Sequence, residues 1–475
     1  MNQSRRYFLQ TAGAVTLGFA GFRQLSQTFA NNLPKAEDIP FGYGDLVRDP
    51  NGLIDLPKGF SYTAFSKTGE RMSDGLLVPG KHDGMAAFPG PKGKTILVRN
   101  HELEPTDDAI SPYGADLKYL VRVTTNHFYD YGRGKVPGLG GTTTLVYDTK
   151  KGMLDSHFLS LAGTHRNCAG GPTPWNSWVS CEETTLMKTG MVDKDHGYNF
   201  EVPATAKPSF ADPIPLTGMG RFRHEAIAVD PNSGAVYETE DVEDGCIYRY
   251  LPDTPGKLAK GGRLQALGIR DRKGLDTRNF PASEGQSPPN ESLPIGETLE
   301  TVWIDLDEVE SPNDDLRLRA YEKGAARFAR GEGMWYGNDA VYFACTSGGQ
   351  KKLGQIFRYV PSPVEGTPEE EKQPGKLELF IEPNDGKLVT NCDNLTVSPW
   401  GDLIVCEDGS DDAYTNSLVG VTPKGEVYRF GQGHAAVELA GCTFSPDGST
   451  LFFNVQERGW TMAVTGPWQE RSKPS

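Results

Sequence analysis

The stretch Cys168–Glu183 places a thiol at one end and two adjacent carboxylates, Glu182 and Glu183, at the other. Between them, Gly170 and Gly171 permit unusual backbone angles and a close approach of the main chain to an ion. The composition predicts a tight loop followed by a short strand that ends on acids. A thiolate and carboxylates brought together in this way would suit a metal site of mixed softness. The alternative is a small buried cysteine, because free cysteine is among the most buried residue types.

Further acids stand at corresponding places of a sequence unit that returns along the chain. The unit is a polar residue, an apolar strand, a turn rich in Pro, Gly and Asx, a second apolar strand ending on acids, and often a third strand such as Ile-Tyr-Arg-Tyr. It occupies residues 224–250, 332–359, 393–408 and 441–457. Such repeats build radially stacked antiparallel sheets, so we predict an all-β fold, a β-propeller with a few inserted helices. A β-sandwich or a solenoid is the alternative, because periodic short strands do not separate these folds.

In a propeller the innermost strand of each blade lines the central channel, so the residues that start these strands point towards one channel mouth. Here those residues are Cys168, Glu225, Glu332 and Asp393, with Glu183 across a short loop. Four carboxylates and a thiolate at one mouth repel strongly at low dielectric unless cations compensate them. The pattern therefore predicts bound multivalent metal ions. Each acid taken singly could instead be a solvated loop end or a turn cap.

One helix is predicted, with Ser311 as its cap and Pro312 at its first position, running to about Arg330. Arg330 then lies two residues before Glu332, on the approach to the predicted metal site. A guanidinium there would suit a phosphate or carboxylate group, which it can bind bidentately. The alternative is a cation that compensates the dipole at the helix C-terminus. The single histidine beside the acids, His224, is expected to be structural.

The N-terminal residues are predicted to be a targeting signal. Residues 4–9 form a twin-arginine pattern, and an apolar, glycine-rich run follows from Thr11 to Phe22. That run is too short to span a bilayer, which favours a signal peptide, residues 1–30, over a membrane helix. The twin-arginine export machinery, which carries folded proteins, would be its partner. The alternative is an N-terminal helix that happens to carry two arginines.

The remaining residues, 31–475, are expected to form a single catalytic β-propeller domain, with no membrane span after signal removal. The net charge of -15, from 63 acidic and 48 basic residues, disfavours nucleic acid as a partner, since that binding depends on phosphate neutralisation. The 56 glycines and 34 prolines are typical of a turn-rich β protein. Seven cysteines are an odd number, so at least one stays free or binds a metal.

Four motifs together resemble the PhoX-type alkaline phosphatase family: 168–183, His224-Glu225, Phe328–Gly333 and Asp393-Asn394. The resemblance implies a six-bladed propeller that holds Fe³⁺ and Ca²⁺ and hydrolyses phosphate monoesters, small-molecule substrates, in the periplasm or outside the cell. It also implies the roles of six residues: metal ligands at Cys168, Glu225, Glu332 and Asp393, and a catalytic ligand and phosphate contact at Glu183 and Arg330. Asn176 departs from the family pattern, in which a glycine is usual at this position.

Two other functions are compatible with the same residues. One is a calcium-stabilised propeller that binds a partner without hydrolysis, and the other is a lactonase-like hydrolase with one calcium ion and no thiolate ligand. The fold cannot decide between them, because propellers host many functions. Iron together with calcium would favour the phosphatase, whereas calcium alone would favour either of the others.

The twin-arginine interpretation predicts that replacing Arg5 and Arg6 by lysine leaves uncleaved precursor in the cytoplasm, because the export machinery reads the arginine pair. Immunoblots of cytoplasmic and exported fractions measure this. Normal export and cleavage of the double variant would contradict the interpretation.

Overall fold

The computed structural model describes residues 42–188, 190, 192–282, 291–409, 416–434 and 437–469. The predicted signal peptide, residues 1–30, lies outside these residues. None of the helices in the described ranges has the length and hydropathy needed to cross a membrane. The described chain is almost entirely strand and turn, as the composition predicts.

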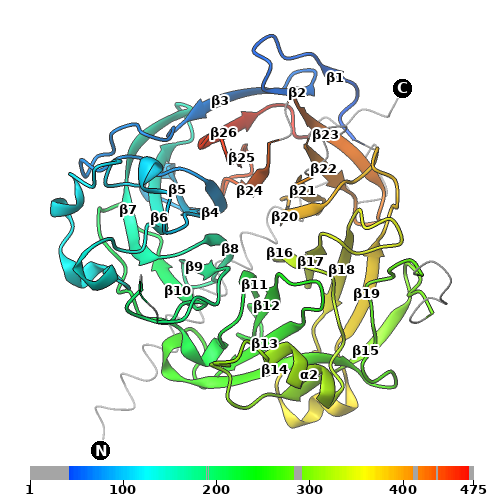
Figure 1. Cartoon of the computed structure of the whole chain (residues 1–475). Coiled ribbons are helices and arrows are strands. Elements are labelled where there is room, and N and C mark those ends of the chain that lie inside the picture. Colours follow the sequence, from blue (N-terminus) through cyan, green and yellow to red (C-terminus); the bar gives the residue numbers. More distant parts are fainter. Residues whose placement is uncertain are drawn as a thin grey trace, which may run out of the picture.

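Six strands stand in a closed ring around a central axis, each in contact with the next (Figure 1). All six are the innermost strands of their sheets, so their side chains line the axis. They are β4 (His82–Pro89), β8 (Asn167–Pro172), β11 (His224–Val229), β16 (Gly331–Gly337), β20 (Cys392–Val397) and β24 (Leu439–Phe444).

Antiparallel sheets run outward from these strands. From β4 follow β5 (Thr95–His101), β6 (Gly140–Asp148) and β7 (Met153–Thr164), and from β8 follow β9 (Ser177–Glu182) and β10 (Asn199–Pro203). From β11 follow β12 (Val236–Glu240), β13 (Ile247–Pro252) and β14 (Gly262–Ile269), and from β16 follow β17 (Ala340–Cys345), β18 (Gln355–Val360) and β19 (Lys376–Ile381). A further strand, β15 (Thr298–Asp305), pairs with both β14 and β19 and joins these two sets into one nine-stranded sheet.

The last two sheets are completed by strands from the beginning of the chain. From β20 follow β21 (Leu403–Glu407), β22 (Ser417–Val421), β23 (Val427–Gly433), β2 (Ile54–Pro57) and β1 (Leu46–Val47). From β24 follow β25 (Thr450–Val455), β26 (Trp460–Thr465) and β3 (Ser61–Phe65). The predicted all-β propeller is confirmed. The six-bladed count stays a prediction, because hydrogen bonding divides the strands into five sheets.

The ring closes where the two ends of the chain pair. Strand β3 continues the sheet of β26 in antiparallel register, with Phe65 opposite Thr461. Aromatic rings from distant parts of the sequence pack beside this seam, and their mutual edge-to-face and stacked contacts add to the area they bury. They include Tyr43, Phe60, Phe430 and Trp468. Non-covalent packing of this kind holds the described ring closed.

Each inner strand carries a β-bulge near its start. The register with the neighbouring strand shifts within the first few residues of β4, β8, β11, β16, β20 and β24 alike. A bulge leaves a residue out of the regular pairing and re-aims its side chain. The second residue of five inner strands lies within this irregularity, whereas in β24 the shift directly follows the second residue, Ala440.

The third residue of five inner strands is glycine or alanine, and the sixth is Asn394. There the strands approach so closely that a Cβ does not fit at the glycine positions. A Cβ on Gly333 would lie 2.6 Å from the Cα of Asn394, and a Cβ on Gly84 would lie 2.5 Å from the Cα of Ala169. Side-chain amides bind the backbone at this level, since Asn394 accepts a bond from the Gly441 N–H at 2.7 Å. Small residues therefore bring the second residues of neighbouring strands together.

The structure corrects three local predictions. The segment around Cys168 is strand β8 and not a loop, because it pairs with β9 across the Pro-Thr-Pro turn. Residues 252–300 are rich in Pro, Gly and Ser, which predicts a surface excursion, but β14 and the start of β15 lie in them. The predicted helix is α2 (Leu316–Lys323), shorter than expected, because Gly324 adopts a left-handed conformation with φ 108° and caps it.

Arg330 is therefore not part of a helix, and the alternative role of a dipole-compensating cation is wrong. After Gly324 the chain is extended and forms isolated bridges with residues of the neighbouring sheet, at Ala325 and at Phe328. Arg330 directly precedes β16.

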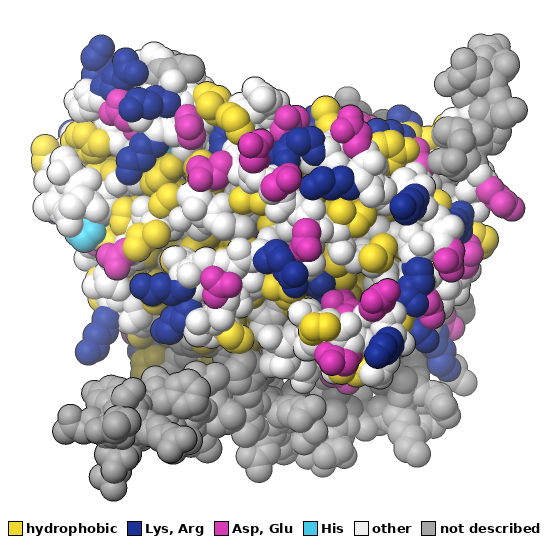
Figure 2. Space-filling view, turned by 90° about the horizontal axis from the view of Figure 1, so that it is seen from below, with side chains coloured by type: hydrophobic (Ala, Val, Ile, Leu, Met, Phe, Trp, Pro, Cys, Tyr) yellow, Lys and Arg dark blue, Asp and Glu magenta, His cyan; other side chains and the backbone are white. Residues whose placement is uncertain are grey.

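The face of the molecule in Figure 2 carries acidic and basic side chains interspersed, without an extended basic stripe.

The close packing of the inner strands predicts that Gly333→Ala lowers the free energy of unfolding by about 1–3 kcal/mol, the usual cost of overpacking a close-packed site. Thermal unfolding measures the effect. Gly190→Ala is the matched control, because a Cβ at Gly190 meets no atom within 4 Å. Equal melting temperatures for the two variants would contradict the packing described.

Candidate metal centre

The mouth of the ring lies at the end where every inner strand begins, and the second residue of each strand faces it. Five of these six side chains can bind a cation, which follows from the repeat described above. The set is Asp83, Cys168, Glu225, Glu332, Asp393 and Ala440.

A second set of polar residues joins the first from the neighbouring strands. In each sheet the chain returns to the mouth at the end of the second strand, and the next residue lies beside the start of the inner strand. His82 is opposite His101, for example, so Glu102 lies beside Lys81 at the start of β4, and its N–H donates to the Lys81 carbonyl at 3.0 Å. The six residues are Glu102, Glu183, Asp241, Thr346, Asp408 and Gln456.

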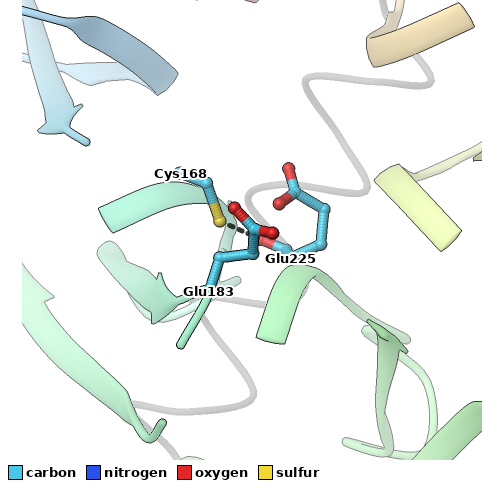
Figure 3. Close-up of side chains that lie close together, drawn as sticks. All are labelled: Cys168, Glu183 and Glu225. Carbon is cyan, nitrogen blue, oxygen red and sulfur yellow. Dashed lines mark hydrogen bonds between the residues drawn. The ribbon is translucent and has the colours of Figure 1, made fainter. Parts of the chain in front are cut away.

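Two groups of donors are close enough to share a metal ion. One atom each of Cys168, Glu183 and Glu225 lie within 4.8 Å of one another, and so do atoms of Glu225, Glu332 and Asp393. Figure 3 shows the first group, in which Cys168 from β8 and Glu183 after β9 approach Glu225 from β11. Glu225 belongs to both groups. The structure thus brings together all five side chains predicted to line the mouth.

These groups are buried, and burial raises their pKa values. Burial, followed by the nearby Asp241, raises the pKa of Glu183 to about 8, and burial raises that of Asp393 to about 6. The pKa of Glu225 lies well above its ordinary value because the group is buried and faces Asp393, Glu183 and Asp83. Burial, followed by the nearby Glu225, Glu183 and Asp83, raises the pKa of the Cys168 thiol. Cations at the mouth would reverse these shifts by favouring the ionised forms.

The other half of the mouth is also acidic, which the sequence reasoning missed. Asp83, Glu102 and Glu438 all approach the amide nitrogen of Gln456, at 2.9, 3.1 and 2.8 Å. An amide has two N–H groups, so it cannot satisfy three carboxylates at once. Burial, then Asp393 and other acids, raises the pKa of Asp408 to about 7. The acidic cluster therefore extends around the axis.

The donor chemistry fits the metals that the resemblance implies. A thiolate with carboxylates at Cys168, Glu183 and Glu225 suits a transition-metal ion. The oxygen-only set at Glu225, Glu332 and Asp393 suits a hard cation such as Ca²⁺ or Fe³⁺. Buried carboxylates in this number require compensation beyond two nearby arginines. Which residue would hold iron and which calcium does not follow from the donors alone.

Two arginines reach the acids of the mouth. Arg330 binds Asp241 through Nε and Nη2 at 2.8 and 2.7 Å, and its Nη2 also lies 3.1 Å from Glu332. Arg166 contacts Glu183 and lies 3.0 Å from Glu102. These ion pairs raise the pKa of both guanidinium groups, so both stay charged.

Glu182 and His224, which belong to the sequence motifs, support the strands and do not line the mouth. Glu182 does not join its neighbour Glu183 at the mouth: it accepts a bond from His196 at 2.7 Å and backbone N–H bonds from His165 and Gly197 at 2.9 Å. His224 is buried, with Nδ1 3.2 Å from Glu238, and its ring packs on a phenylalanine. Both contacts hold the strand ends that carry Glu183 and Glu225.

A sequence signal for the missed residues exists. The inner strands begin with a short pattern of a polar or basic residue, any residue, a ligand-type residue and a small residue. It reads Lys-His-Asp-Gly at 81–84, Arg-Asn-Cys-Ala at 166–169, Arg-His-Glu-Ala at 223–226, Arg-Gly-Glu-Gly at 330–333 and Asn-Cys-Asp-Asn at 391–394. Alignment of the four-residue pattern would have found Asp83 and Arg166.

Fold and site together define a β-propeller with an acidic candidate metal centre at one channel mouth. The sequence profile described as alkaline phosphatase PhoX matches residues 41–459, which is most of the chain. The chain belongs to the alkaline phosphatase PhoX family, and the resemblance stated from the motifs is confirmed. Its enzyme class is accordingly that of the phosphoric monoester hydrolases.

The chain shares its fold with a solved structure. PhoX of Pseudomonas fluorescens, in complex with the transition state analogue vanadate, matches with a TM-score of 0.64 at 18% identity, covering 91% of this chain and 99% of that one. A gluconolactonase of Xanthomonas campestris matches with a TM-score of 0.40 at 14% identity over 90% of this chain and 99% of its own, too low a score to carry an argument. No curated protein sequence matches the chain.

The raised carboxyl pKa values predict that the chelated protein loses stability as the pH rises from 6.5 to 8. Glu183, with a pKa of about 8, and Asp408, with a pKa of about 7, keep protons in the folded state that they release when unfolded, so folding is disfavoured as these protons are lost. Calorimetry in chelator should show a melting temperature several degrees lower at pH 8. The window starts at 6.5 because buried histidines such as His157 have lowered pKa values and act in the opposite sense below it.

Added metal ions should flatten this pH dependence, because they stabilise the ionised carboxylates. Glu183→Gln should reduce it in chelator, because one of the titrating groups is removed. A melting temperature in chelator that is constant or rises between pH 6.5 and 8 would contradict the assignment.

Proposed function

We propose that the protein is an exported metallophosphatase that hydrolyses small-molecule phosphate monoesters at the mouth of its propeller. One observation carries the proposal: Glu225 belongs to two adjacent donor groups, one with a thiol and one with oxygen donors only. A shared carboxylate of this kind can bridge two cations of different character. Family membership supplies the reaction class.

The residues that would hold the ions are Cys168, Glu183, Glu225, Glu332 and Asp393, with Asp83, Asp408 and Glu438 nearby. Bound iron and calcium would supply positive charge that neutralises and orients a phosphoryl group and activates the attacking oxygen. The ligands come from strands rather than mobile loops, and the bulges and backbone contacts of the ring fix their positions. Rigid support is what a preorganised site requires.

Arg330 would bind the phosphoryl oxygens. Asp241 holds the guanidinium through Nε and Nη2, which orients its plane and leaves Nη1 without a hydrogen bond among the described residues. A fixed donor directed at the mouth stabilises charge on the equatorial oxygens without reorganisation during the reaction. Its support by Asp241 could not be inferred from the sequence.

Export by the twin-arginine pathway to the periplasm or the outside of the cell is part of the proposal. It rests on residues 4–9, which lie outside the described residues. A route that carries folded proteins suits a site built from all parts of the described ring. Nucleic acid is not proposed as a partner, given the net charge of -15.

The test is elemental analysis of the purified exported protein together with a phosphomonoester assay before and after chelation. We expect iron and calcium, and loss of most activity when the metals are removed. Cys168→Ala should lose bound metal and most activity, because carboxylates alone do not reproduce a thiolate site. Conversely, calcium without iron and no phosphatase activity would favour the binding or lactonase-like functions.

A further inference from the structure

Three arginines occupy the same place in the repeated unit. Arg166, Arg223 and Arg330 directly precede the inner strands β8, β11 and β16, which are neighbours in the ring. Each has the same position relative to the strand that follows it. Differences between them therefore arise from their own backbone and partners.

The backbone separates Arg223 from the other two. Arg166 and Arg330 adopt positive φ values of 45° and 52°, as do Lys81 and Asn391 at the equivalent places before β4 and β20, whereas Arg223 does not. The left-handed conformation is uncommon for a residue other than glycine, and at this place in the repeat Arg223 is an exception to it. Arg166 and Arg330 contact acids of the mouth, whereas Arg223 pairs with Asp314 at 3.1 Å, ahead of helix α2.

Arg166 and Arg330 lie at different donor groups. Arg166 contacts Glu183 of the group that contains Cys168, and Arg330 lies 3.1 Å from Glu332 of the other group. Because Glu225 is common to both groups, the two guanidinium groups flank it. Their side chains are 34% and 38% exposed, so both remain accessible from solvent at the mouth.

Each guanidinium also retains donor capacity. The Nη2 of Arg166 contacts Glu183 and Glu102. Its Nη1 has one neighbouring acid among the described residues, the partly exposed Glu104, at 3.3 Å. One N–H of that Nη1 is therefore available in the described structure, as is the Nη1 of Arg330. The dianion of a phosphate monoester has three non-bridging oxygens, enough to accept from both arginines while also facing cations.

We propose that Arg166 is a second phosphate-binding residue, which contacts the phosphoryl group from the side opposite Arg330. This inference rests on the proposed function. The two guanidinium groups would hold the phosphoryl group over Glu225, each kept in place by acids of its own and the neighbouring sheet. Arg166 is then a catalytic residue, and its contact with Glu183 orients it.

The experiment compares Arg166→Gln, Arg330→Gln and the matched control Arg223→Gln in the metal-loaded protein. It measures metal content, kcat/KM for p-nitrophenyl phosphate and inhibition by inorganic phosphate. We expect the first two variants to keep their metals, to lose on the order of a hundredfold in kcat/KM, the scale of one preorganised donor, and to bind phosphate more weakly. Arg223→Gln should behave as the wild type.

Two further measurements separate contact with phosphate from structural support. Arg166→Lys should recover only part of the activity, since an ammonium cannot reproduce the planar fork, and it serves as the test if Arg166→Gln does not fold. Added guanidinium ion at non-denaturing concentration should partly restore Arg166→Gln, which a purely structural role does not predict.

The proposal is overturned if Arg166→Gln loses metal in proportion to activity, because Arg166 then only positions Glu183. It is also overturned if kcat/KM and phosphate inhibition stay within a few-fold of the wild type while Arg330→Gln is impaired. Failure of the proposed function looks different: the metal-loaded wild type would neither hydrolyse the ester nor be inhibited by phosphate.

Discussion

The structure depends on the burial of many carboxylates around one axis. In a medium of low dielectric such groups repel one another, and their raised pKa values express that repulsion. The fold contributes two fixed cations, Arg166 and Arg330, which do not balance the acids. Bound multivalent ions would supply the compensation that full ionisation of these acids requires, and the ionised acids would in turn bind the ions.

The close approach of the inner strands makes this concentration of charge possible. Backbone contacts at the third residue of the strands, such as Gly333 against Asn394, leave no room for a Cβ at the glycines. They thereby fix the distance between the second residues of neighbouring strands. The bulge at each strand start then directs the second residue to the axis. Repetition of one local geometry in every inner strand yields a site that no single segment could form.

The repeated units could be predicted from the sequence because alternation of apolar and polar residues is a local property. The same holds for Cys168, Glu225, Glu332 and Asp393, which occupy one position of the repeat. The helix end could not be predicted, since its stop depends on the left-handed Gly324 and on bridges to another sheet. Asp83 was missed because its short motif precedes a strand that the sequence reasoning did not identify.

Other features depend on tertiary pairing that no local pattern encodes. The side chains of the adjacent acids Glu182 and Glu183 point to different places, because the chain turns at the end of β9. Glu183 lies at the mouth, whereas Glu182 forms a hydrogen bond with His196. Strand β15 joins two expected sheets into one. The place of Arg166 at the mouth follows only from its contacts with Glu102 and Glu183. The residues that line the mouth could be predicted where the repeat fixes their positions. The side chains that contact them could not be predicted.

The pairing of β3 with β26 has a consequence for biosynthesis. The ribosome delivers β3 before β26, and the ring cannot close until residues 461–465 have emerged and paired with residues 61–65. The inner strands β4 and β24 meet beside this seam, so the sixth side of the mouth forms only then. A nascent chain that lacks β26 would therefore present an incomplete cluster of donors at the mouth. On this geometry the full set of donors comes together only when the ring has closed.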